Sequence, residues 1–169
     1  FYYFFKPSIN DFSTPNLREL KISFCLPIKK FSRLENEDTF LILNQKASLS
    51  KIGWDNNFYK MPKLWRYNQH YFDYLDSVDA EINQEWCKKL LDLWVIQNPI
   101  GKGVGWDSYP LSLRIVNWIK WSLAGKVLTD KCINSLALQA RWLYKRIEWH
   151  ILGNHLFSNA KALIFAGLF

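Results

Sequence analysis

The stretch "GWDSYPLSLRIVNWIKW", from Gly105 to Trp121, decides the fold class because its pattern is that of an amphipathic helix. Arg114 and Trp118 stand four positions apart, so a cation and an indole share one helix face. Ser108 occupies the place expected of an N-cap, and Pro110 fits the first turn. We therefore predict a helix that begins at Ser108.

Further helical patterns flank this stretch on both sides. Helical spacing of apolar side chains occurs in residues 63–78, 79–97 and 129–151, and Asp79 is the predicted N-cap of the second pattern. A last helix is expected to begin near Asn154 and to continue as a buried helix. The predicted core faces are Ile82, Trp86, Leu90, Leu93 and Trp94 in the second pattern, and Leu136, Ala140, Leu143, Ile147 and Ile151 in the third. Such helices joined by short loops favour an all-α stack of antiparallel hairpins, as a toroid or a bundle.

The first third of the chain has a different character. Prolines at positions 7, 15 and 27 disfavour long helices, and the apolar run Thr39–Asn44 is compatible with a short strand. We therefore divide the chain into residues 1–60, an irregular segment with possible short strands, and residues 61–169, an incomplete α/α toroid. The apolar ending "FAGLF" lacks a helix end signal, from which we expect the chain to be part of a larger protein.

Composition and charge limit the classes of partner. Apolar residues make up 49% of the chain and aromatic residues 17%, which suffices for a sizeable core. The nine Trp and eight Tyr would suit either an aromatic helical core or a groove for flat sugar rings. A net charge of +7 favours an anionic partner, such as nucleic acid, a phospholipid surface or an acidic polysaccharide. No basic run reaches five residues and no zinc-finger or RNP-type pattern occurs, which disfavours nucleic acid.

Neither a membrane span nor a cofactor site is predicted. No apolar run approaches ~18 residues, the minimum for a spanning helix. "GKGVG" (Gly101–Gly105) lacks the GK[ST] ending of a phosphate-binding loop, and we predict a turn between helices there. Glu148, His150 and His155 could suggest a zinc site, but the two histidines are five positions apart and face different directions on a helix, which disfavours metal. The three cysteines are expected to be buried small hydrophobic residues: Cys25, Cys87 and Cys132.

Two pairs of residues are candidates for binding a substrate or transferring a proton. Asn154 and His155 follow Gly153 at a helix start, where backbone N–H groups favour an anion, and a histidine can exchange a proton near neutral pH. The alternative is a helix cap with a satisfied histidine. Arg114 beside Trp118 could grip a carboxylate while the indole packs on a sugar face, or it could pair with a structural acid such as Asp107.

Three segments in this order resemble the N-terminal helical domain of heparinase II/III-type polysaccharide lyases. They are "LWRYNQHYFDYL" (Leu64–Leu75), "GWDSYPLSLRIVNWIKW" and "HILGNHLFSNAKALIFAGLF" (His150–Phe169), and the resemblance covers about residues 40–169. It is closest to members associated with bacterial surface-polysaccharide gene clusters. The resemblance implies an (α/α) toroid followed by a β-sandwich that this chain does not contain, and a location in the periplasm or cell envelope.

The resemblance also implies β-elimination at C4 of a uronic acid, with an acidic polysaccharide as substrate and no cofactor. Asn154 would neutralise the sugar carboxylate as the C5 proton leaves, and one such donor is worth ~3–4 kcal/mol. His155 would be a base or a binding partner. The tyrosine acid or base would lie beyond Phe169, and a further histidine would come from the sandwich, so the fragment alone is expected to be inactive. The residues expected to line the sugar cleft are Tyr67, Asn68, His70, Tyr71, Trp106, Arg114 and Trp118.

Two alternatives remain open at this point. The same cleft could bind or guide a glycan without cleaving it, in a protein of bacterial surface-polysaccharide assembly. A helical scaffold that binds protein or nucleic acid would instead present a continuous basic surface away from any aromatic groove.

Overall fold

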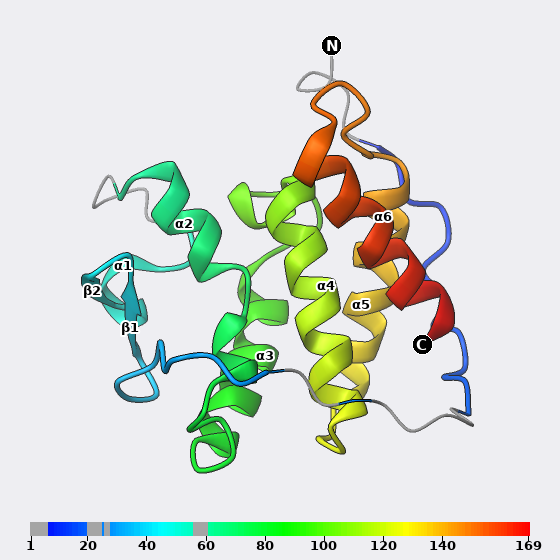
Figure 1. Cartoon of the computed structure of the whole chain (residues 1–169). Coiled ribbons are helices and arrows are strands. Elements are labelled where there is room, and N and C mark those ends of the chain that lie inside the picture. Colours follow the sequence, from blue (N-terminus) through cyan, green and yellow to red (C-terminus); the bar gives the residue numbers. More distant parts are fainter. Residues whose placement is uncertain (1–6, 20–24, 26–27, 56–60) are drawn as a thin grey trace.

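The computed structural model describes residues 7–19, 25, 28–55 and 61–169, and within them the protein is mostly helical with one small sheet (Figure 1). Strands β1 (Thr39–Ile42) and β2 (Gln45–Ser48) form an antiparallel hairpin in which Thr39 pairs with Ser48. Leu43 and Asn44 join them at positive φ, the two-residue turn that matches strand twist. This confirms the predicted strand, and apart from the hairpin and α1 (Leu49–Ile52) the described part of 1–60 lacks helices and strands.

Three long helices form the body of the protein. Helices α4 (Ser108–Leu123), α5 (Asp130–Tyr144) and α6 (Gly153–Leu168) run in alternating directions along the chain (Figure 1). Helix α4 is the central element, since most of its side chains are buried, and it packs against both α5 and α6. The predicted all-α hairpins therefore occur, and Pro110 lies in the first turn of α4 as expected.

Beside α4 lie two shorter helices and two 3₁₀ turns. Helix α2 (Lys63–Gln69) precedes the 3₁₀ helix η1 (Asp73–Asp76), α3 (Gln84–Gln97) packs against α5, and η2 (Val104–Trp106) leads into α4. The core between them is built of rings packed mostly edge to face: Trp94 against Trp118, Phe72 against Trp118, and Trp106 against Trp142. Such pairs add ~0.5–1.5 kcal/mol each beyond area burial. Most of the described tryptophans therefore belong to the core.

The predicted continuous helix over 63–78 is wrong. Helix α2 ends at Gln69, and Phe72 adopts φ 60, in the left-handed region, before η1 begins. This conformation is unfavourable for a side chain with a Cβ. It places the fully buried Phe72 ring against Trp54, Trp94 and Trp118, and this packing offsets the backbone cost.

Several predicted boundaries also differ. Helix α3 begins at Gln84 rather than after Asp79, whose carboxylate instead accepts a hydrogen bond from the Asn83 amide at 3.1 Å. Ile82 therefore lies before the helix and is 88% exposed. Asp107, not Ser108, precedes α4, and the Ser108 hydroxyl donates to the carbonyl of Arg146 at 2.6 Å.

The ends of the last two helices correct the prediction further. Helix α5 ends at Tyr144, so Ile147 and Ile151 lie in the following turn and not on its core face. Helix α6 begins at Gly153, one residue from the prediction, but it is not a buried helix. Only Asn159 and Ala162 are fully enclosed, while exposed apolar side chains occur along it: Phe157, Ile164 and Leu168.

The three cysteines are free thiols. Cys87 and Cys132 are buried as predicted, and burial raises the pKa of each to about 12. Cys25 is exposed, contrary to the prediction. None of the described helices has the length and apolar character that a bilayer span requires.

Candidate functional site

The turn before α6 positions Asn154 and His155. Leu152 has φ 59 with ψ −159, and Gly153 has φ 54, so two consecutive residues have positive φ as the chain enters the helix. Strain of this kind at a leucine costs about 1–2 kcal/mol and is often found near functional sites. Asn154 is exposed and His155 is half-buried, so both are accessible from solvent. The first backbone N–H groups of α6 lie in the same turn, where they favour an anion.

His155 is held between an aromatic ring and a carboxylate. Its imidazole stacks on Tyr109, with ring centroids 4.4 Å apart and an interplanar angle of 30°. Nδ1 lies 3.1 Å from Oε1 of Glu148, within ion-pair reach although the ring N–H is not aligned for a hydrogen bond. The carboxylate favours a hydrogen on Nδ1, and this leaves Nε2 as the nitrogen that can accept a proton.

Asn159 holds Glu148 in place through two hydrogen bonds. Its Oε2 accepts a hydrogen bond from the Asn159 amide at 3.2 Å, and its backbone N–H donates to Asn159 Oδ1 at 2.8 Å. The buried Asn159 also donates to the Ser112 hydroxyl at 3.0 Å, which ties the turn to α4. The imidazole therefore rests on a polar network that spans α4, α6 and the turn between α5 and α6.

Further contacts connect this side of α4 with the chain around η1. The Tyr71 ring meets Tyr109 edge to face at 6.1 Å, and Asn117 donates to the Tyr71 carbonyl at 2.8 Å and to Asp73 at 3.0 Å. Burial, with Tyr109 and Asp73 beside it, raises the pKa of the Tyr71 hydroxyl. Tyr71, Tyr109, Asn117, Asp73, His155, Glu148 and Asn154 are called the α4 face below.

Four residues predicted to line a sugar cleft lie in the core instead. His70, Arg114 and Trp118 are fully buried, and Trp106 is 3% exposed. Side chains without contact to solvent cannot stack on a sugar, so their predicted role in lining an open cleft is wrong. For Arg114 and Trp118 the reason is that helical spacing does not fix which face of α4 meets the core, and both lie on the face that packs against it.

Arg114 satisfies neither of the two alternatives considered from sequence. Its guanidinium stacks on Trp94 at 3.8 Å, Nε donates to Gln139 at 2.9 Å, and Nη1 donates to the carbonyl of Gly105 at 2.8 Å. Asp107 is not its partner; that carboxylate accepts a hydrogen bond from the Tyr67 hydroxyl. Burial without a carboxylate holds the pKa of Arg114 well below its usual range.

Three predicted lining residues remain. Tyr71, in the α4 face, is only 7% exposed, so it too is largely closed to solvent, whereas Tyr67 and Asn68 are half-buried on α2. Tyr67 is engaged with Asp107, and Asn68 accepts a hydrogen bond from Arg33 Nη1 at 3.1 Å. Arg33 also lies 3.7 Å from Asp73 of the α4 face. Asn68 is thereby connected to the α4 face through Arg33, whereas Tyr67 belongs to the α2–α4 junction.

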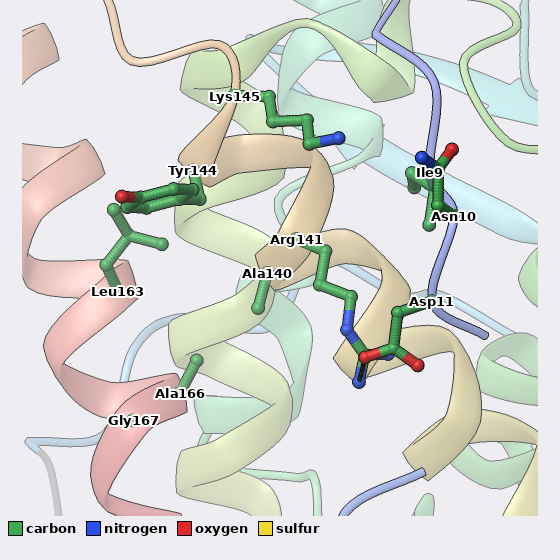
Figure 2. Close-up of a pocket in the computed structure, with 10 residues that line it drawn as sticks. All are labelled: Ile9, Asn10, Asp11, Ala140, Arg141, Tyr144, Lys145, Leu163, Ala166 and Gly167. Atoms are coloured by element: carbon green, nitrogen blue, oxygen red, sulfur yellow. Dashed lines mark ion pairs between the residues drawn. The ribbon is translucent and has the colours of Figure 1, made fainter. Parts of the chain in front are cut away.

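A cavity of about 500 Å³ lies on another side of α6 (Figure 2). Helices α5 and α6 and the segment 9–11 enclose it, and Arg141 points to Asp11 across its mouth, with an ion-pair distance of 2.8 Å. Its lining is largely apolar and contains none of the α4-face residues. The cavity is therefore separate from the candidate site, because the arrangement of His155, Tyr109 and Glu148 lies outside its lining.

Sequence reasoning missed several members of the α4 face. Tyr109 and Asn117 are in the quoted stretch, and their spacing of eight positions could have placed them on one side of the helix. Glu148 was considered only as a possible metal ligand, and among the described residues no group of three or more His, Cys, Asp and Glu is arranged for a metal ion.

Comparison with family models, with curated proteins and with solved structures finds no match to this chain.

Proposed function

We propose that this chain provides the uronic-acid-binding part of a polysaccharide lyase that cleaves acidic glycans by β-elimination. The observation that carries the proposal is the accessible imidazole of His155, stacked on Tyr109 at 4.4 Å and braced by Glu148, next to the exposed amide of Asn154. The net charge of +7 is compatible with a polyanionic substrate.

The chemistry requires a neutral donor and a base on the same sugar. In the proposed reaction the Asn154 amide donates to the carboxylate, which makes the proton on C5 more acidic. His155 Nε2 removes that proton, and the electron pair forms the C4–C5 double bond while the C4–O bond breaks. The leaving oxygen takes a proton from an acid, which the family resemblance assigns to a tyrosine beyond Phe169.

The wider architecture that we propose is an (α/α) toroid. Helices α4, α5 and α6 alternate in direction and pack as neighbours, which is compatible with successive hairpins of such a toroid (Figure 1). In this arrangement α4 would form the floor of the substrate site, with η1 and the start of α6 as its sides. The proposed location remains the periplasm or cell envelope.

The test is incubation of the full-length protein with a panel of acidic glycans while the ultraviolet absorbance of unsaturated products is followed. Asn154→Ala is expected to lower turnover about 10²–10³-fold, as for loss of an oxyanion donor. His155→Gln should abolish it, and His150→Gln, at an exposed histidine before α6, serves as the matched control. Unchanged turnover in both site variants would remove these residues from the mechanism.

The alternative is a glycan-binding protein without lyase activity. The stacked Tyr109 and His155 rings favour it equally, because aromatic rings can hold a sugar without reaction. Glycan binding that depends on Tyr109, without any rise in absorbance, would select this alternative. Binding to nucleic acid in place of glycans would instead select the helical scaffold.

A further inference from the structure

Beyond His155, the α4 face borders a group of cations contributed by three parts of the chain. Lys30 precedes the β-hairpin, Lys120 lies in the last turn of α4, and Lys161 lies on α6. Lys161 follows His155 by six residues on α6, about 9 Å along the axis at ~1.5 Å per residue. It stands two residues after Asn159, whose amide donates to the Ser112 hydroxyl of α4 at 3.0 Å, on the helix that packs against α4. These lysines are called the lysine cluster below.

Two of the three lysines are anchored by acids of η1. Lys30 Nζ lies 2.7 Å from Asp73 Oδ1, and Lys120 Nζ lies 3.4 Å from Asp76 Oδ2. The same Asp73 oxygen accepts the hydrogen bond from Asn117, and Arg33 stands 3.7 Å from its other oxygen. The acids therefore fix the direction of these cations and partly neutralise them.

Lys161 differs from the other two. Among the residues that the structure describes, no carboxylate lies within ion-pair distance of it, and its Nζ lies 5.9 Å from the centroid of the Phe165 ring. Its own desolvation and the nearby charges of Lys120 and Lys30 lower its pKa. With Arg33 included, four cations face two carboxylates, which leaves a surplus of two positive charges. A bound anion would relieve the repulsion among the lysines.

We propose that Lys30, Lys120 and Lys161 form a second anion subsite, which holds the carboxylate of a sugar adjacent to the one held by Asn154 and His155. This inference rests on the proposed function and makes it more specific. The substrate class becomes a glycan with uronic acids on neighbouring sugars, because an isolated uronic acid between neutral sugars would leave the lysine cluster without a partner.

The experiment measures dissociation constants of galacturonic acid and of trigalacturonic acid by calorimetry at low ionic strength. The trimer should bind more tightly than the monomer, and Lys161→Met should weaken the trimer about fivefold, the upper range for a partly exposed ion pair, without changing the monomer. Lys161→Arg should retain tight trimer binding. Lys131→Met, at an exposed lysine of α5 outside the cluster, is the matched control.

The possible results separate this inference from the proposed function. If trimer and monomer bind equally, or if the preference for the trimer survives Lys161→Met, the second subsite is wrong while the α4 face retains its proposed role. If neither ligand binds, both proposals are overturned. A trimer preference that Lys161→Met removes and added salt weakens supports the subsite.

Discussion

The most quantitative prediction concerns His70, which is buried beneath the α4 face. The Trp94 indole N–H donates to Nδ1 at 2.9 Å, so Nδ1 carries no hydrogen, and Nε2 therefore donates to the Trp54 carbonyl at 3.0 Å. Protonation would place a second N–H against the Trp94 donor. Burial and the nearby Arg114 charge lower the pKa of His70 to about 3.

The pH dependence of stability follows from this shift. An unfolded histidine titrates near 6.5, so between pH 6.5 and about 3 the unfolded chain binds a proton that the folded protein excludes. A group with a lowered folded pKa of this kind loses stability as pH falls. From pH 7 to pH 5 the loss is about 2 kcal/mol at 1.36 kcal/mol per pKa unit. This value depends little on the folded pKa, provided that it lies well below 5.

The assay is urea unfolding followed by tryptophan fluorescence at pH 7 and pH 5, with His70→Gln as the comparison. Glutamine can still donate towards the Trp54 carbonyl but does not titrate. The unfolding free energy of the wild type should fall by about 2 kcal/mol more than that of the variant over this interval. Equal losses in the two proteins would refute the assignment of a neutral, proton-excluding His70.

Three further predictions concern packing, thiols and the imidazole. Gly105→Ala would put a Cβ 2.5 Å from the His70 ring. Thermal denaturation should show that the free energy of unfolding falls by about 1–3 kcal/mol. The control is Gly167→Ala, which has open space around it on α6 and should not destabilise the protein. A thiol reagent should modify one cysteine in the native protein and three in urea, because two are enclosed: Cys87 and Cys132. Glu148→Gln should shift the His155 ring away from the Nδ1–H tautomer in nitrogen NMR; an unchanged tautomer ratio would mean that Glu148 does not orient the ring.

The helices could be predicted because their signals are local. Periodicity from Ser108 onwards located α4 within one residue, and Gly153 marked the start of α6. The break at Phe72 could not be predicted in this way, because nothing local to that residue favours a positive φ. It depends on contacts with Trp54, Trp94 and Trp118, which come from three distant parts of the chain.

The candidate site was predictable only in part. The pair Asn154 and His155 was identified from its place at a helix start, and both side chains are accessible. Helical spacing cannot determine which face of α4 meets the core, so Arg114 and Trp118 were assigned to the wrong surface. Partners that converge through tertiary packing, such as Tyr109 and Glu148 around His155, have no signature in sequence separation.

The central claim is that the α4 face binds the uronic acid. An NMR titration with trigalacturonic acid, following ring signals of tyrosine and histidine, tests it most directly. We expect the signals of Tyr109 and His155 to shift together with saturation, and those of Tyr144, beside the cavity between α5 and α6, to remain unchanged. Shifts confined to Tyr144, or no shift at His155, would contradict the account.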